Sequence, residues 1–203
     1  YDQMAPAYDV SLLLFKMVGF RLETYRKKAI ENLQLKRGET VVDLGCGTGL
    51  NFKMIHEKVG KNGKIIGVDL SKSMLEKAKD RAKRNQWHNI DFNHIDMADF
   101  KFTKNHDAVL STMAMSMSPH YDKIFEKAAL NLNEGKRISI FELQKPQNWP
   151  DWLIRIMVKI LSSYGTRYEH TKRTPCKSIE RHYRNSSIQN YYFDAVCLAS
   201  GIV

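Results

Sequence analysis

A glycine-rich turn at residues 41–49 constrains the fold of this chain more than any other feature. The segment reads VVDLGCGTG, so an apolar run leads directly into three alternating glycines, and a helical pattern follows. This order is typical of a strand, a tight turn and a helix N-terminus in an α/β sheet. Glycine suits such a turn because it tolerates angles that a Cβ penalises and lets a ligand approach the backbone. The free N–H groups of the helix start add a partial positive charge, so we expect a nucleoside-type cofactor site here.

The spacing of the glycines excludes two common kinds of cofactor-binding loop. A dinucleotide-binding G-x-G-x-x-G loop needs its third glycine at position 50, but the chain has Leu50 there and Gly49 one residue earlier. A phosphate-binding P-loop needs Gly-Lys-Ser/Thr, and that tripeptide does not follow. A strand–turn–helix that binds nothing is the alternative, and it is disfavoured by a second motif at a suitable distance.

That second motif is a strand that ends in a carboxylate. Residues 64–69 read KIIGVD, and Asp69 follows Gly49 by twenty residues. An acid at the tip of the neighbouring strand can accept both hydroxyl hydrogens of a ribose. The alternative is an acid that stabilises the next helix N-terminus, but Ser71 is better placed as the N-cap. We therefore favour the ribose role for Asp69.

The rest of the chain alternates between strand and helix patterns. Apolar residues in 11–35 recur every three or four positions, which predicts two helices meeting near Gly19. Further strands are expected at 40–44, 64–69, 90–94, 106–111 and 136–143, with helices at 51–59, 71–85 and 121–132. The segment 188–201 reads as two more strands. Five strand–helix repeats predict an α/β, doubly wound, mostly parallel sheet.

Composition indicates one globular domain but does not identify the class of partner that it binds. The 203 residues are 43% hydrophobic and 27% charged, with a net charge of +10. Such a charge favours nucleic acid, an acidic membrane surface or an acidic substrate, or it serves solubility alone. Three cysteines without C-x-x-C spacing predict neither a disulfide nor a zinc site, and they suggest a reducing, cytoplasmic location. The chain begins at Tyr1 and not at methionine, which is compatible with a further segment upstream.

We divide the expected domain (1–203) into an N-terminal helical cap (1–35), a core (36–145), a lid-like insertion (146–187) and terminal strands (188–203). The insertion begins with a helix from residue 149 to about 164 that is apolar on most faces, and a cationic stretch follows at 165–187. This pattern fits a lid over a lipid-like substrate or a surface that docks on anionic lipid. It fits equally a lid that packs on its own core. The basic helix at 71–85 has no interleaved aromatic residues, so we expect a solvated face and not a nucleic-acid patch.

The segment VVDLGCGTG resembles motif I of class I S-adenosylmethionine-dependent methyltransferases, in which an acid stands two places before G-x-G-x-G. GVDLS at 67–71 and HIDMADF at 94–100 extend the resemblance. It implies a seven-stranded Rossmann-like sheet with an antiparallel last strand, S-adenosylmethionine as cofactor and no metal. Asp69 would hold the ribose, Asp96 the adenine amino group (with Asp99 as the alternative acid) and Met97 the adenine ring. The other cofactor-binding residues that it implies are Asp43, Gly45, Cys46, Gly47 and Gly49 at the methionine end, together with Leu70, Met74 and Ser111.

Within this class the chain looks similar to ubiquinone/menaquinone C-methyltransferases and to bacterial phosphatidylethanolamine N-methyltransferases. YDQMAPAYD at 1–9 resembles their YDxxAxxYD segment, which folds over the cofactor; a cap whose tyrosines only pack is the alternative. The expected substrate pocket contains Tyr1, Tyr8, Met113 and Met115, and residues 111–117 at the end of the fourth strand are expected to form its floor. Where the lipid-type enzymes often have Arg-Pro-Trp, residues 174–176 are Thr-Pro-Cys, which departs from their lid pattern.

The implied reaction is methyl transfer to a small-molecule or lipid-like acceptor, with peripheral contact with an anionic membrane as an additional expectation. No base is needed for a neutral amine nucleophile, whereas a carbon or phenol nucleophile needs one. Tyr8, His120 and Glu142 are candidates by position alone, so the catalytic residue stays unknown. An RNA or protein methyltransferase is one alternative, disfavoured because no Asn-Pro-Pro-Tyr motif follows the fourth strand. A non-catalytic cofactor-binding protein on the same fold is another.

Overall fold

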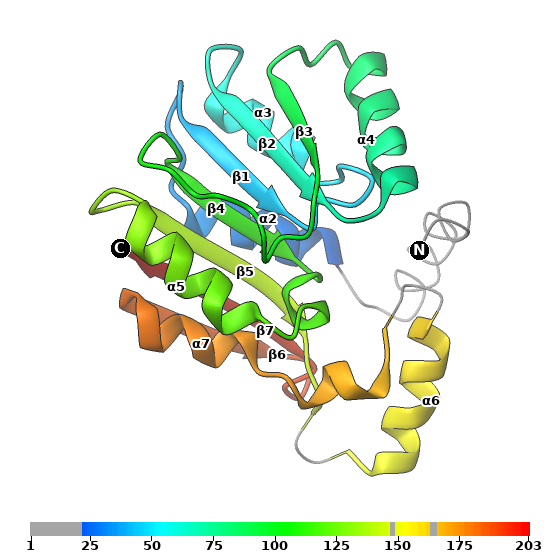
Figure 1. The fold of residues 1–203 in the computed structure, drawn as a ribbon. Coiled ribbons are helices and arrows are strands. Elements are labelled where there is room, and N and C mark those ends of the chain that lie inside the picture. Colours follow the sequence, from blue (N-terminus) through cyan, green and yellow to red (C-terminus); the bar gives the residue numbers. More distant parts are fainter. Residues whose placement is uncertain (1–21, 147–148, 163–165) are drawn as a thin grey trace.

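A seven-stranded sheet organises the computed structural model, which describes residues 22–146, 149–162 and 166–203 (Figure 1). Five parallel strands come first along the chain, and the last two form a hairpin in which β7 runs antiparallel to both β5 and β6. The strands are β1 (Thr40–Leu44), β2 (Lys64–Asp69), β3 (Ile90–His94), β4 (Ala108–Thr112), β5 (Arg137–Leu143), β6 (Arg184–Tyr191) and β7 (Val196–Ile202). This confirms the predicted fold class.

The order of the strands fixes where a ligand can bind. The sheet runs β3-β2-β1-β4-β5-β7-β6, so the chain moves outward from β1 to β3 and then returns to the other side of β1 with β4. In open α/β sheets, the carboxyl ends of the strands at such a reversal flank a crevice. The turn after β1, which contains the three glycines, therefore lies at the expected ligand-binding edge.

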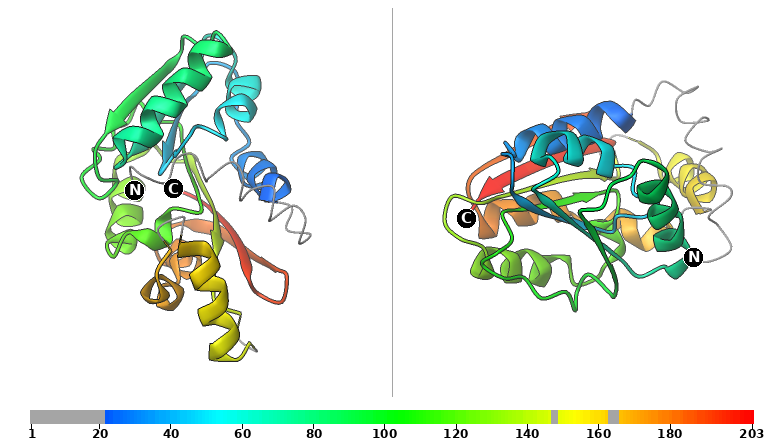
Figure 2. Two further views of the ribbon diagram at one scale, coloured as in Figure 1. Left: turned by 90° about the vertical axis from the view of Figure 1, so that its right-hand side faces the viewer. Right: turned by 90° about the horizontal axis from the view of Figure 1, so that it is seen from above.

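Helices cover both faces of the sheet (Figure 2). One buried cluster joins the strands to α2, α3 and α4, and the other joins them to α5 and α7. The helices are α2 (Leu22–Asn32), α3 (Phe52–Val59), α4 (Lys72–Arg84), α5 (Tyr121–Asn131), α6 (Asp151–Leu161) and α7 (Pro175–His182), and two 3₁₀ helices are η1 (Met115–Met117) and η3 (Tyr168–Lys172). The first helix predicted within 11–35 lies outside the described residues, as do Tyr1 and Tyr8.

The start of α4 has the predicted N-cap, Ser71. The Ser71 hydroxyl accepts a hydrogen bond from the Met74 backbone N–H at 3.3 Å, which is the N-cap contact. Met74, Leu75 and Ala78 are buried, and the basic side chains of the helix lie on its more exposed side. Asp69 is therefore not needed as a helix cap.

The insertion is more regular than its sequence suggests. α6 ends at Leu161, earlier than expected, and α7 follows where the sequence pattern predicts no element. Pro175 occupies the first turn of α7, a position at which proline favours helix initiation, so a local signal was present. α7 packs against α5 and β7 and completes the second buried cluster.

The cysteine prediction is wrong. Cys176 in α7 and Cys197 in β7 form a disulfide across 21 residues, with their Cα atoms 6.6 Å apart. Their pairing depends on the packing of α7 against β7, which the spacing of cysteines along the chain does not reveal. Cys46 is a buried free thiol. The expectation of a reducing compartment rested on the absence of a predicted disulfide, so it is no longer supported.

Candidate cofactor site

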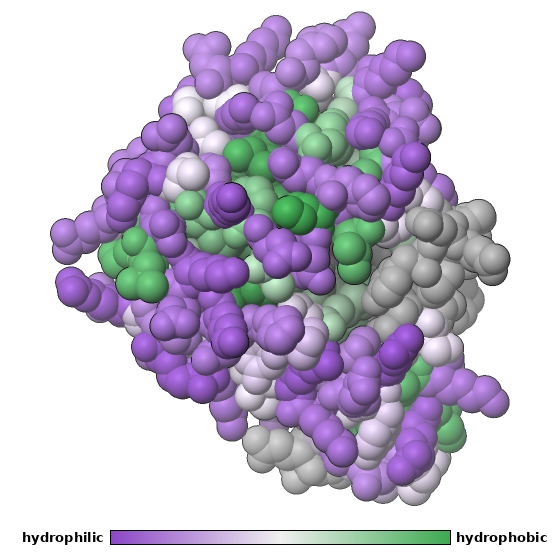
Figure 3. Space-filling model, in the orientation of Figure 1, coloured by the Kyte–Doolittle hydropathy of each residue, from purple (hydrophilic) through white to green (hydrophobic). Residues whose placement is uncertain are grey.

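A cavity of about 330 Å³ lies at the carboxyl ends of β1, β2, β3 and β4. Figure 3 shows apolar residues gathered in the middle of the molecule's face and bordered by hydrophilic ones. The cavity is lined by Gly45, Gly47, Asp69, Leu70, Ser71, Met74, Asp96, Met97, Thr112, Met113, Ala114, Met117, Ser118 and Pro119. Four loops that are distant in the sequence, one after each of these strands, therefore meet at the switch point of the sheet.

Asp69 ends β2 and joins two of these loops. One carboxylate oxygen, Oδ2, accepts a hydrogen bond from the Gly47 N–H at 2.8 Å, and Oδ1 accepts one from the Ser71 N–H at 2.9 Å. Burial raises the pKa of this carboxyl group above its ordinary value, and the two backbone hydrogen bonds oppose that shift. Each oxygen retains lone-pair capacity for a further donor on the cavity side.

Two glycines provide the space at the end of β1. Gly45 has φ of +67°, and an added Cβ would lie 2.2 Å from the Cβ of Ala114, closer than two carbon atoms can approach. Gly47 has φ of +54°, and nothing lies within 4 Å of the position that its Cβ would take. Gly45 is thus required by close packing and by its backbone conformation, whereas Gly47 leaves open room beside the cavity.

A buried polar network lies beneath the glycine turn. Asn51 donates from Nδ2 to both carboxylate oxygens of Asp43, at 3.0 and 3.1 Å, and to the Thr112 hydroxyl at 3.0 Å. Arg26 of α2 donates to the Asn51 Oδ1 at 3.2 Å and also to the Thr112 hydroxyl. Burial raises the pKa of Asp43 to about 7, although the Asn51 hydrogen bond and the Arg26 charge lower it. Asp43 therefore faces this network and not the cavity lining.

The loop after β3 supplies the far wall of the cavity. The Asp96 Oδ1 accepts a hydrogen bond from the Ala98 N–H at 2.8 Å, which fixes the carboxylate within its own turn. Met97 lies next to it and approaches the glycine turn. Leu70, on the neighbouring loop, is 61% exposed. Asp99, the alternative to Asp96 for the adenine amino group, is exposed.

Glu142 fixes the loop after β4 by hydrogen bonds. This fully buried carboxylate on β5 accepts hydrogen bonds from the N–H groups of Ala114 and Met115, at 3.1 and 2.6 Å, and from the Ser116 hydroxyl at 2.9 Å. Burial raises the pKa of Glu142 to about 7, against the effect of these donors. Met113 has φ of +59°, a conformation rare for a non-glycine residue, which indicates that the surrounding contacts impose it.

Most of the predicted site residues line the cavity, and some do not. Ser111 is buried and donates to the Leu44 carbonyl at 3.0 Å, and Met115 belongs to the hydrophobic core. His120 is exposed immediately before α5 and is not among the lining residues. The predicted residues on the lining are Gly45, Gly47, Asp69, Leu70, Met74, Asp96, Met97 and Met113; those behind it are Asp43, Cys46, Gly49, Ser111 and Met115. Thr112, Ala114 and Met117 also line the cavity and belong to the segment 111–117 expected at its floor, whereas the prediction missed Ser71, Ser118 and Pro119. Their signal was positional, because they follow β2 or β4 directly.

Comparison with known proteins identifies the family. A protein-family model described as a methyltransferase domain matches residues 35–190, which is most of the chain. This chain belongs to that methyltransferase family. The match confirms the family that the glycine turn and the two acidic strand ends indicate.

Characterised relatives of the methyltransferase are moderately similar in sequence. It is 29% identical to an arsenite methyltransferase of Halobacterium salinarum over 119 residues, 56% of this chain and 29% of the relative. It is 25% identical to a demethylmenaquinone methyltransferase of Listeria welshimeri over 154 residues, 75% of this chain and 64% of the relative. The chain thus spans less than two thirds of the length of either relative.

Solved structures show the same fold at low identity. A geranyl diphosphate C-methyltransferase from Streptomyces coelicolor superposes with a TM-score of 0.65 at 14% identity, covering 89% of this chain and 75% of that one. A SAM-dependent methyltransferase from Aquifex aeolicus gives a TM-score of 0.60 at 14% identity, covering 88% and 89%. These likenesses establish the seven-stranded methyltransferase architecture for this chain.

Proposed function

We propose that this chain transfers a methyl group from S-adenosylmethionine to a small-molecule or lipid-like acceptor. The single observation that carries the proposal is Asp69. Its carboxylate lines the cavity at the end of β2 and is oriented by the backbone of the glycine turn and of α4. A fixed carboxylate at this position suits a ribose diol, which offers two donors on neighbouring carbons.

The other lining residues fit the same cofactor. Gly47 leaves open room beside the first turn, and Gly45 lines the cavity there, which suits the narrow amino acid end of the molecule. Asp96 and Met97 present a carboxylate beside an apolar side chain, which suits an exocyclic amino group on a flat ring. We propose the remaining predicted residues, Asp43, Cys46, Gly49 and Ser111, as the support behind this surface, since they are buried next to it.

S-adenosylmethionine supplies, when bound, a methyl group already activated on a sulfonium ion. The task of the protein is then to hold the acceptor in line with that group and to exclude water. Orientation of this kind accounts for about 7–11 kcal/mol of barrier reduction. Glu142 is occupied with three donors of the loop after β4, so it fits a structural role better than that of a general base.

The acceptor end of the cavity is mostly apolar. Met113, Met117 and Pro119 line it on the loop after β4, and flexible methionine side chains adapt to varied apolar shapes. The relatives named above act, by their names, on arsenite and on demethylmenaquinone, which span a small inorganic species and an isoprenoid quinone. The apolar lining favours the larger, lipid-like acceptor for this chain.

A methyl-transfer assay tests the function directly. The protein is incubated with radiolabelled S-adenosylmethionine and with separated lipid, small-molecule, RNA and protein fractions of a cell extract. We expect label in the lipid or small-molecule fraction. Label confined to RNA or protein would contradict the acceptor class, and cofactor binding with no transfer to any fraction would indicate a non-catalytic binding protein.

We also propose that the protein contacts anionic membranes peripherally through α6. Trp152 and Ile156 lie one turn apart on this helix and are 63% and 49% exposed, while Ile154 is buried toward the protein. Arg155 and Lys159 are exposed on the same helix, so it carries cationic groups as well as the apolar ones. Phe193, in the turn between β6 and β7, is 84% exposed beyond the carboxyl end of β5. None of the helices within the described ranges could span a bilayer.

Replacing both Trp152 and Ile156 with glutamate is expected to weaken this contact. Sedimentation with vesicles that contain phosphatidylglycerol should fall by about tenfold or more, because burying a large apolar side chain contributes about 1.5–3 kcal/mol. The matched control is Leu130→Glu on α5, since Leu130 is 71% exposed away from α6 and should leave binding unchanged. Equal sedimentation of the double variant and the unmodified protein would contradict the proposal.

A further inference from the structure

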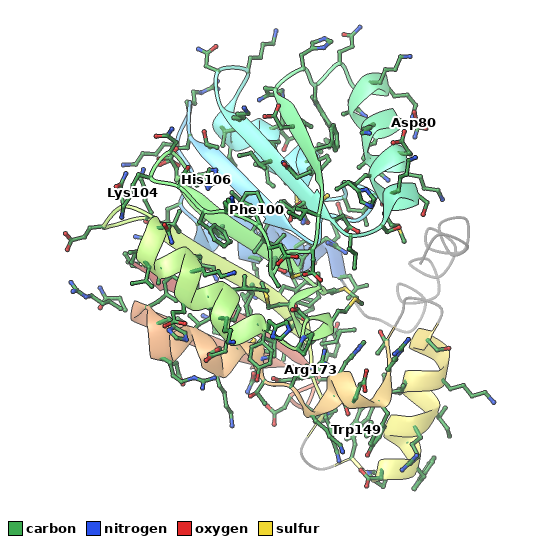
Figure 4. The ribbon with its side chains drawn as sticks, viewed as in Figure 1. Asp80, Phe100, Lys104, His106, Trp149 and Arg173 are labelled. Carbon is green, nitrogen blue, oxygen red and sulfur yellow. A yellow bond between two sulfur atoms is a disulfide. The ribbon has the colours of Figure 1, made fainter. Side chains whose placement is uncertain are left out.

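Arg173 connects the insertion to the loop that lines the acceptor end of the cavity. Its Nη1 donates to the carbonyl oxygens of Ser116 at 2.7 Å and of Met117 at 2.8 Å. Figure 4 labels Arg173 where the chain passes from η3 toward α7, next to the loop after β4. Arg173 is 57 residues from Ser116 in sequence, so only the fold brings these groups together.

The two carbonyls lie at the end of η1, where a cation is most useful. Within that short helix, the Met117 N–H donates to the Ala114 carbonyl at 3.0 Å and the Ser118 N–H to the Met115 carbonyl at 3.2 Å. The next carbonyls along the chain, those of Ser116 and Met117, lie beyond these turn bonds. Helix C-termini carry such orphan acceptors together with a partial negative charge, and an arginine can satisfy both.

Glu142 acts on the same loop from the opposite direction. It accepts from the donors that precede and begin η1, namely the N–H groups of Ala114 and Met115 and the Ser116 hydroxyl. The loop is therefore fixed by an anion on β5 at its start and by a cation from the insertion at its end. Met117, Ser118 and Pro119 continue directly from this fixed segment onto the cavity lining.

We propose that Arg173 is a positioning residue that sets the shape of the acceptor end of the cavity, and thereby makes acceptor selection depend on the insertion. This inference rests on the proposed function, because it assigns the methionine-lined end of the cavity to the acceptor. Arg173 is not itself a lining residue; it contacts the lining residue Met117 at its carbonyl oxygen and therefore acts through the main chain of η1. The cofactor end, around Asp69 and Asp96, is formed by other loops.

The test compares Arg173→Ala and Arg173→Lys with Lys172→Ala. Lys172 is the adjacent exposed residue, so its replacement removes the same charge without the carbonyl contacts. Hydrogen–deuterium exchange of the intact protein is measured for the peptide that covers residues 113–119. In Arg173→Ala the amides of Met117 and Ser118 should exchange about tenfold faster, because two charge-assisted hydrogen bonds that fix the loop are lost. Arg173→Lys should recover part of this protection, and Lys172→Ala should match the unmodified protein.

Kinetics supply the second measurement, with a total lipid extract as the acceptor. Arg173→Ala should raise the apparent KM for the extract by about tenfold, since a loosened wall weakens acceptor binding, while the dissociation constant for S-adenosylhomocysteine stays within about twofold. Unchanged exchange at residues 113–119 would overturn the proposal, and so would exchange that rises equally across the sheet, because Arg173 would then contribute only to global stability. If the unmodified protein methylates nothing in the extract, the proposed function fails, but the exchange comparison still decides whether Arg173 positions the loop.

Discussion

Replacing Asp69 with alanine is expected to raise the dissociation constant of S-adenosylhomocysteine by about two orders of magnitude or more. The ribose would lose two hydrogen bonds to a carboxylate, each worth about 1.5–3 kcal/mol, and every 1.4 kcal/mol is a factor of ten in affinity. Isothermal titration calorimetry measures the change directly. Asp69→Asn should have a smaller effect, because the amide oxygen still accepts one hydrogen bond.

The control must separate ligand contact from loop order, since Asp69 also accepts from the N–H groups of Gly47 and Ser71. Thermal unfolding of the variant reports whether these contacts carry much stability, and the Ser71 N-cap should preserve α4. Asp99→Ala provides the matched acid, because Asp99 is exposed and follows the same edge of the sheet. An Asp69→Ala protein that binds S-adenosylhomocysteine with undiminished affinity would refute the ribose role.

Replacing Glu142 with alanine is expected to lower the free energy of unfolding by about 3 kcal/mol or more at pH 6. Three donors, the N–H groups of Ala114 and Met115 and the Ser116 hydroxyl, would lose their acceptor, and an unsatisfied buried donor costs about 1–3 kcal/mol. Urea unfolding at equilibrium measures the loss. Glu142→Gln should lose much less, because its amide can still accept from the backbone and donate to the hydroxyl.

The titration of Glu142 adds a pH dependence with a definite sign. Its pKa is raised from 4.5 to about 7 in the folded protein, so the folded state holds a proton that the unfolded chain releases. The associated stability is complete below pH 4.5 and is lost as the pH rises through 7, at up to about 1.4 kcal/mol per pH unit. Asp43, raised from 3.8 to about 7, acts in the same direction.

Unfolding at a series of pH values from 5 to 8 isolates the share of Glu142. In Glu142→Gln the decline in stability over this range should become shallower, and the other buried carboxyl groups with a raised pKa, Asp43 and Asp69, should contribute to the remaining slope. The control Glu134→Gln should retain the full slope, because that side chain is 87% exposed. A slope identical in Glu142→Gln and the unmodified protein would show that Glu142 does not titrate in this interval.

The sheet was largely predictable because its signals are local. Four of the five parallel strands are short apolar runs that a helix follows, and the boundaries differ from the prediction by only a few residues. The exception is β3 (IDFNH), which is mixed in polarity and leads to β4 without a helix between them. The handedness and shortness of strand–helix–strand connections then leave few arrangements. α7 was missed because its eight residues, PCKSIERH, are mostly polar, although four of them are buried in the fold.

The candidate site was predictable only where its residues follow a strand directly. Asp69, Asp96 and Met113 were placed in this way, and all three line the cavity. The β4 residue on the cavity lining is Thr112, one position after the predicted Ser111, which is buried beside it. Alternation along a strand turns such a shift into a change from the cavity to the core.

The sequence by itself determined the succession of strands and helices, the glycine turn and the acid at the end of β2, because each depends on neighbours within a few residues. The tertiary structure decided which distant groups meet. Arg26 reaches Asn51 and Thr112 from another helix, Glu142 holds a loop from the next strand, and Cys176 pairs with Cys197. These contacts depend on sheet register and helix packing to within about an ångström, and no local pattern encodes that placement. The glycine turn at residues 45–49 therefore identified the family, whereas the walls of the cavity around it came from the packing of the whole chain.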